Sequence, residues 1–276
     1  CNQGTVYQDG STKKTKKALD LKGGLMFNTE KITQAKADFA VKRYCVIDNI
    51  LEEKYINALY EEAPKMPYQV RARATGIDLR PYEVDYKHSD EFQQTLEQYI
   101  QNAKGNFSYF HHVYVAAKDK KNHADPFVTE FNHIIQEDYT HGHPDYTFHD
   151  LATAITGFPN MIAKNGNYGY YDYQSWLKMH NDVRRWCAYI FYFNPAWEPD
   201  WGGQLCIMDD TGKNIKESIV PYGNRLVLMD VSKVDINSHF VSPVSIGADH
   251  PRYSLSGWFY QKEKDGPGPE KRLTNQ

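Results

Sequence analysis

The stretch of sequence that decides the fold runs from residue 180 to residue 194 and reads HNDVRRWCAYIFYFN. Its first three residues, His180-Asn181-Asp182, place an imidazole and a carboxylate two positions apart. On an extended strand, residues i and i+2 point to the same side. The motif therefore predicts that His180 and Asp182 can bind one ion. The apolar run that follows predicts a buried strand beside them.

A third ligand is expected from a distant strand. His239, in Ser238-His239-Phe240-Val241, lies in the penultimate predicted strand. Two histidines and one carboxylate on one face of an octahedron form the facial triad of non-haem iron(II) oxygenases. Two of the three open positions suit a bidentate 2-oxo acid, and one suits O₂. We predict His180, Asp182 and His239 as the metal ligands and the catalytic residues.

An arginine follows in the expected order. Arg252 begins the last predicted strand, thirteen residues after His239. An arginine that points inward there can grip the distal carboxylate of 2-oxoglutarate with two parallel N–H bonds. The order of motif, distal histidine and arginine predicts an iron(II) and 2-oxoglutarate site.

Composition narrows the class of protein. The 276 residues suffice for one large domain, and a net charge of -3 argues against binding nucleic acid by neutralising phosphates. The longest apolar run, residues 186–193, is too short to cross a membrane, and no signal peptide is visible. No cysteine pair has metal-ligand spacing, so we expect free thiols, a reducing compartment and an intracellular, cytoplasmic protein. The cysteines are Cys1, Cys45, Cys187 and Cys206, and a chain that starts at Cys1 is expected to begin inside a longer one.

The predicted fold class is α+β and mainly β, with helices packed on one face of a β-sandwich. Residues 71–87 are predicted to form an arginine-rich loop. Helical spacing and caps predict helices at 50–62, 89–104, 126–137 and 146–156. Strands are predicted at 39–47, 107–117, 168–173, 186–194, 204–208, 225–230, 237–244 and 252–261.

Residues 171–259 resemble the prolyl 4-hydroxylase-like group of 2-oxoglutarate/Fe(II) oxygenases. Within it, the resemblance is closest to the ribosomal-protein prolyl hydroxylase branch and its microbial relatives. The similarity rests on Tyr171, Leu177, HND at 180–182, YIFYFNPAW at 189–197, WGGQL at 201–205, PYGNRLV at 221–227, HFVSPV at 239–244 and RYSLSGWF at 252–259. The second, C-terminal jelly-roll domain of the ribosomal-protein enzymes is not found in these residues.

The resemblance implies a double-stranded β-helix, or jelly roll. Composition predicts a flexible basic lead-in (1–24) and a disordered tail (263–276), which leaves one oxygenase domain (25–262). Within the domain, 25–165 form a helical support region and 166–262 the jelly-roll catalytic core.

The resemblance also implies the cofactors and further site residues. These are Fe(II), the cosubstrate 2-oxoglutarate and O₂, with ascorbate as a supporting reductant. Arg252 and Tyr192 are expected to hold the 2-oxoglutarate C5 carboxylate, Tyr171 to line that pocket, and Gly202-Gly203 to form a tight hairpin turn beside it. Because Asp182 supplies the carboxylate that related halogenases lack, hydroxylation is favoured over halogenation, while desaturation and oxidative cyclisation stay open.

Two substrate classes remain open, a prolyl residue in a protein or peptide and a free amino acid or amino-acid-derived metabolite. Arg184 and Arg185 are candidate contacts for a substrate carboxylate, and Arg71, Arg73 and Arg80 are weaker candidates. The rival histidines at 111, 112, 141, 143 and 149 lack metal-ligand spacing, so we interpret them as loop residues. A hypothesis of another class is a non-catalytic jelly roll that only binds a partner. The sequence predicts no oligomeric state.

Overall fold

The computed structural model describes residues 27–74, 77–78, 82–83, 94, 109–115, 125–135, 147–159, 161–173, 175–182, 185–233 and 236–261. Its helices are α1 (Ile32–Lys42), α2 (Glu53–Glu62), α4 (Pro126–Ile135) and α5 (Phe148–Thr156). Its strands are β1 (Tyr44–Asp48), β2 (Gln69–Ala74), β3 (Ile77–Asp78), β4 (Tyr82–Glu83), β5 (Tyr109–Val115), β6 (Met161–Tyr171), β7 (Trp176–His180), β8 (Cys187–Tyr192), β9 (Leu205–Met208), β10 (Ile215–Ile219), β11 (Arg225–Asp230), β12 (His239–Val241) and β13 (Arg252–Gln261).

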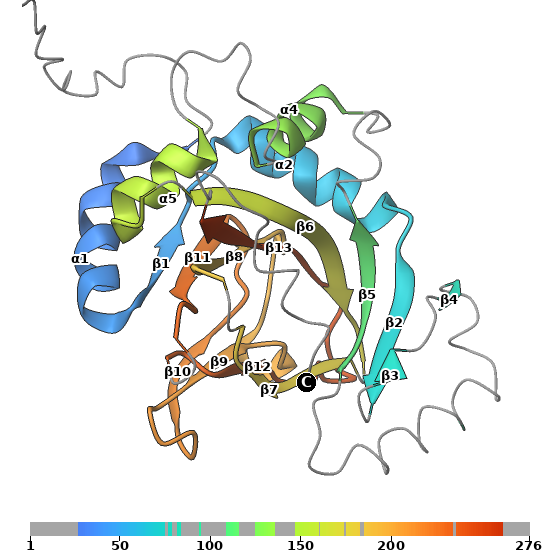
Figure 1. The fold of residues 1–276 in the computed structure, drawn as a ribbon. Helices are drawn as coiled ribbons and strands as arrows, with labels where there is room; N and C mark the ends of the chain where they lie inside the picture. The colour runs from blue at the N-terminus through green and yellow to red at the C-terminus, as the bar shows by residue number, and fades with distance from the viewer. Residues whose placement is uncertain are drawn as a thin grey trace, which may run out of the picture.

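The strands form one continuous antiparallel ladder that folds into two facing layers. Its order is β1-β11-β8-β13-β6-β5-β7-β12-β9-β10, and β2 pairs with β5. Side chains of β9 and β10 pack in one buried cluster with side chains of β8 and β11, so these strands face each other across the core. Figure 1 shows β7, β9, β10 and β12 below the larger layer.

The apolar run in β8 is buried on both faces. Cys187, Tyr189 and Phe191 belong to the cluster that packs against the helices. Ala188 and Tyr192 belong to the cluster between the two layers. Alternate residues of a strand point to opposite faces, so a strand covered on both sides needs a continuous apolar run.

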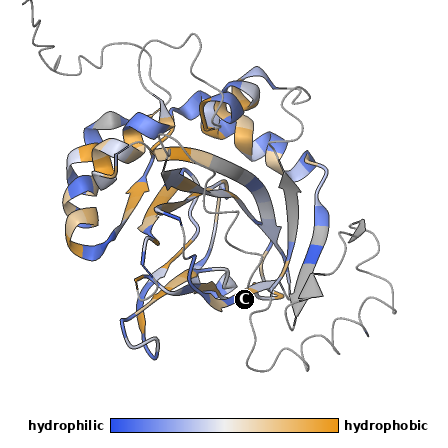
Figure 2. Ribbon diagram, viewed as in Figure 1, coloured by the Kyte–Doolittle hydropathy of each residue, from blue (hydrophilic) through white to orange (hydrophobic). Residues whose placement is uncertain are grey.

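The helices cover one face of the larger layer, as Figure 1 shows. In α5, Thr147 and Asp150 form a capping box, and Gly157 ends the helix with φ of 72°. Figure 2 shows hydrophobic colouring on β1 and on parts of the helices beside it. No helix in the described ranges is long and apolar enough to span a membrane.

The predicted fold class is confirmed, and several boundaries change. Residues 39–42 are helical rather than extended, since α1 runs to Lys42 and the chain turns at Arg43, with φ of 65°, before β1. Residues 69–74, predicted in part as a loop, form β2 on β5. Strands β7 and β10 were not predicted, because both are short and partly polar.

The predicted helices at 50–62, 126–137 and 146–156 are confirmed within a few residues as α2, α4 and α5. Three cysteines, Cys45, Cys187 and Cys206, are buried and free, as predicted. The lead-in (1–24), the helix at 89–104, the tail (263–276) and Cys1 fall outside the described residues. The division into support region and catalytic core stays a prediction.

Candidate active site

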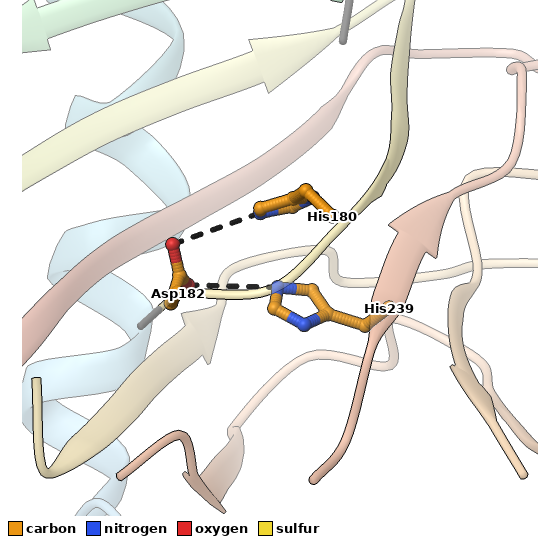
Figure 3. Close-up of side chains that lie close together, drawn as sticks. All are labelled: His180, Asp182 and His239. Carbon is orange, nitrogen blue, oxygen red and sulfur yellow. Dashed lines mark ion pairs between the residues drawn. The ribbon is translucent and has the colours of Figure 1, made fainter. Parts of the chain in front are cut away.

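The three predicted metal ligands converge at one end of the smaller layer. His180 ends β7 and His239 begins β12, and the two are direct partners in the antiparallel register. Directly opposed residues place their side chains on the same face, and the two imidazole rings lie 4.2 Å apart between centroids. Asp182, two residues after β7, lies with one oxygen 3.8 Å from His180 Nε2 and the other 3.6 Å from His239 Nε2. In Figure 3 all three side chains point toward one another.

Backbone carbonyls orient both imidazoles. His180 Nδ1 lies 2.9 Å from the Lys178 carbonyl oxygen, and His239 Nδ1 lies 2.9 Å from that of Asn237. A carbonyl oxygen only accepts, so each Nδ1 carries the proton and each Nε2 presents a lone pair. Burial and the neighbouring His180 lower the pKa of His239 to about 4, against the opposing effect of Asp182. His239 is therefore neutral near pH 7, the form that binds a metal.

The carboxylate of Asp182 accepts hydrogen bonds from two side-chain donors. The indole Nε1 of Trp258 donates to Oδ2 at 2.8 Å, and the guanidinium of Arg185 donates to Oδ1 at 3.2 Å. Arg185 also stacks over the Trp258 ring at 4.2 Å and donates to the Tyr260 hydroxyl at 3.1 Å. Asp182 therefore has a fixed orientation before any ion arrives.

The donor set fits iron(II). The candidate ligand atoms all lie within 4.8 Å of one another, and they border a cavity of about 650 Å³. Two imidazoles and one carboxylate, with room on the open side for further ligands, are the donors that non-haem iron(II) takes. Among the described residues, no other group of histidine, cysteine and acidic side chains meets the same closeness.

Arg252 lies in the same cavity as a buried cation. It begins β13, is 3% exposed, and donates to the hydroxyls of Ser254 and Tyr192, each at 3.3 Å. Its guanidinium lies 4.7 Å from the centre of the Tyr171 ring and 4.8 Å from that of Tyr192. Its Nε has no hydrogen-bond partner, and no described carboxylate pairs with it. A buried arginine without a counter-ion fits a carboxylate ligand.

Both tyrosines beside Arg252 keep their protons. Burial raises the pKa of Tyr171 to about 12, although Arg252 opposes the shift. Burial also raises the pKa of Tyr192 against the same opposition. Their neutral hydroxyls can therefore donate to a bound carboxylate.

The aromatic wall of the cavity comes from β5 and β6, and β2 adds an arginine at its edge. His111 stacks on Tyr171, with ring centroids 5.0 Å apart, and Tyr109 lies 5.1 Å from His111. Arg71 of β2 is the register partner of His111 and lines the same cavity. The wall therefore leads from the buried Arg252 outward to the half-buried Arg71.

The other predicted site residues differ in whether the structure places them at the cavity. Arg185 lines the cavity but binds Asp182 and Tyr260, so its contact with substrate stays a prediction. Arg184 and Arg80 lie outside the described residues, and so does the side chain of Arg73. Of the rival histidines, His111 and His112 belong to β5 and His149 belongs to α5, so the interpretation of these three as loop residues was wrong. His141 and His143 lie outside the described residues.

Two glycines shape the wall next to Arg252. Gly202 and Gly203 have φ of 76° and 67° and join a 3-10 helix (Pro199–Trp201) to β9 rather than two strands of a hairpin. A Cβ on Gly203 would lie 3.0 Å from Cδ of Arg252 and 3.1 Å from the ring of Trp197. The predicted tight turn is present, although its type was wrong, and it makes room for the arginine.

Trp258 and His111 are the functional candidates that sequence reasoning missed. Trp258 follows Arg252 by six positions on one strand, so period-two alternation alone would place it on the cavity side. His111 carried no such signal, because its role depends on pairing between β5 and the distant β6.

Comparison with known proteins agrees with this geometry. Residues 166–260 match the model of the 2OG-Fe(II) oxygenase superfamily. Prolyl 3-hydroxylase OGFOD1 of Mus musculus is 30% identical over 148 residues, which cover 51% of this chain and 25% of that protein. The match thus spans about a quarter of the length of this curated relative.

Solved structures support the fold. A Pseudomonas putida prolyl-4-hydroxylase has a TM-score of 0.50 at 16% identity, covering 84% of this chain and 100% of that chain. A prolyl hydroxylase from Trichoplax adhaerens, solved with a hypoxia inducible factor peptide fragment, has a TM-score of 0.50 at 14% identity, covering 90% and 94%. The residues that match the 2OG-Fe(II) oxygenase superfamily model, 166–260, contain all three converging ligands and strands β7 to β12 of the ladder.

Proposed function

We propose that this protein is an iron(II)- and 2-oxoglutarate-dependent dioxygenase that hydroxylates a prolyl residue. The observation that carries the proposal is one cavity that holds both the His180, Asp182 and His239 cluster and the buried, uncompensated Arg252. When bound, iron(II) and 2-oxoglutarate supply the oxidation of an unactivated C–H bond by O₂, with release of succinate and CO₂.

The chain's own residues bind and orient the reactants. His180, Asp182 and His239 present three metal donors from one side, and Trp258 with Arg185 keeps the carboxylate in place. In the same cavity, Arg252 and the Tyr192 hydroxyl offer donors for the distal carboxylate of 2-oxoglutarate. The aromatic wall shields this carboxylate from water, which strengthens the charged contacts.

A prolyl substrate is favoured by the relatives. The curated relative is named as a prolyl 3-hydroxylase and two of the structural neighbours as prolyl hydroxylases. A cavity of about 650 Å³ exceeds what a five-carbon dicarboxylate fills, so it has room for a ring-sized substrate group as well.

The test is anaerobic titration of the protein with Fe(II) and 2-oxoglutarate, followed by succinate release in air with proline-containing peptides. We expect a weak visible charge-transfer band and substrate-dependent succinate, both lost in His239→Ala. His133→Ala, which removes a histidine from α4, is the matched control and should retain both. The absence of the band in the intact protein would exclude the proposal. Mass and NMR analysis of the product then distinguishes the carbon that is hydroxylated.

A further inference from the structure

The cavity is lined by one arginine, Arg71, to which the proposed reaction assigns no role. Among its described lining residues the charged side chains are Arg71, Arg185, Arg252 and Asp182. Arginine stays protonated in proteins, so three of these four are positive.

Binding of iron(II) and 2-oxoglutarate does not neutralise this excess. The two charges of iron(II) and the charge of Arg252 balance Asp182 and the two carboxylates of 2-oxoglutarate. Arg185 and Arg71 remain positive in a partly enclosed space, where charge attracts an anionic ligand strongly.

The two remaining arginines differ in their contacts. Arg185 is held by Asp182, the Tyr260 hydroxyl and the Trp258 ring. No hydrogen bond or ion pair joins the side chain of Arg71 to any of the residues that the structure describes. Arg71 therefore has its full donor fork available to a ligand.

The position of Arg71 separates it from the cosubstrate. Arg71 pairs with His111 in the register of β2 and β5, so their side chains share one face of the sheet. His111 stacks on Tyr171, and the guanidinium of Arg252 also lies against the Tyr171 ring. Two aromatic side chains thus lie between the two arginines, and Arg71 is the half-buried one, nearer to solvent.

From these contacts we propose that Arg71 binds a carboxylate of the primary substrate, so that the enzyme selects acidic substrates. The inference rests on the proposed function for the identity of the reaction, but not for the binding of the acid. The carboxylate has two possible sources, the α-carboxylate of a free amino acid and an acidic side chain near the target proline in a peptide.

The test compares matched probes in two sets. One set contains amide-capped heptapeptides with a single central proline and a glutamate at one of the three positions on either side, each paired with its glutamine analogue. The other set is L-proline and L-prolinamide. Equilibrium binding is measured by calorimetry on the anaerobic protein with Mn(II), with and without 2-oxoglutarate, and kcat/KM is measured with Fe(II).

We expect an acidic probe from one set to bind the intact protein about 10- to 100-fold more tightly than its neutral match, the range of a hydrogen-bonded charge pair. Arg71→Gln should reduce this ratio to near one and leave 2-oxoglutarate binding unchanged. Arg71→Lys should restore part of it. Lys213→Gln, which removes an exposed charge from the turn between β9 and β10, is the control for net charge and should keep the full ratio.

Three results would overturn the inference. They are an acid preference that persists in Arg71→Gln, equal binding of every acidic and neutral pair, and no binding of any acidic probe. Failure of the proposed function looks different, because it removes 2-oxoglutarate binding and succinate while the probe ratio without cosubstrate still reports on Arg71. The set that shows the ratio identifies the source of the carboxylate.

Discussion

Replacement of Arg252 by methionine should affect cosubstrate binding and protein stability very differently. Arg252→Met keeps an unbranched apolar stem between Tyr171 and Tyr192 but removes the charge. Loss of one partner from a buried, hydrogen-bonded charge pair costs about 2–5 kcal/mol. At about 1.4 kcal/mol per tenfold change, the dissociation constant of 2-oxoglutarate should rise roughly 30- to 4,000-fold.

The stability of the ligand-free protein should change little. Burial of an uncompensated charge costs several kcal/mol. Its contacts with two tyrosine rings return up to about 2 kcal/mol each, and its two long hydrogen bonds, at 3.3 Å, add a little more. These terms nearly cancel, so we expect the free energy of unfolding to change by less than about 1 kcal/mol, in either direction.

The assay combines calorimetry for 2-oxoglutarate with urea unfolding of the ligand-free protein. Arg252→Lys is the matched control, since it keeps the charge without the two-pronged donor geometry, and it should fall between the two proteins in affinity. A variant that loses more than about 3 kcal/mol of stability and binds 2-oxoglutarate normally would refute the reasoning. Arg252 would then be a structural residue.

Three further predictions concern the hydrogen bond to Asp182, the glycine turn beside Arg252 and the pH dependence of stability. Trp258→Phe keeps the ring but removes the N–H donor to Asp182, so metal affinity in equilibrium dialysis should fall about 10- to 100-fold, and an unchanged affinity would exclude that role. Gly202→Ala places a Cβ 2.1 Å from the Pro243 carbonyl oxygen at φ of 76° and should cost more than about 3 kcal/mol in urea unfolding. Gly212→Ala, with φ of 65° and open space, is its control and should cost only about 1 kcal/mol, so equal costs would contradict the clash. Because burial lowers the pKa of His239 from 6.5 to about 4, the unfolded chain binds more protons in this window, and the metal-free protein should lose stability as pH falls through it. His239→Gln should show a smaller loss, and an identical slope in both proteins would contradict this origin.

The sequence predicted the metal ligands because their signal is local. His180 and Asp182 share a motif, and His239 and Arg252 each lie in a run with strand character. The apolar run of β8 also predicted a strand correctly, since a strand buried on both faces has to be apolar throughout. Where neighbours along the chain define the environment, the prediction agreed with the structure.

The sequence could not predict features that depend on distant pairing. β2 is polar and arginine-rich and reads as a loop, yet it pairs with β5 along five residues. The short strand β7 has no fully buried residue, and its position is fixed by β5 and β12. Residues 39–42 read as extended because of Phe39, Ala40 and Val41, although only Phe39 of these is buried, as one face of a helix requires.

The pairing of β1 with β11 has a consequence for synthesis of the chain. Residues 44–48 form their ladder with residues 225–229, and β13, the last strand of the described chain, joins β6 to β8. While the ribosome is still adding residues 225–261, β1, β6 and β8 lack these partners. Contacts so far apart in sequence form slowly, and unpaired apolar strands invite aggregation. The nascent protein therefore has to keep β8 protected until β13 emerges, and Arg252, which we propose binds the cosubstrate, arrives with that strand.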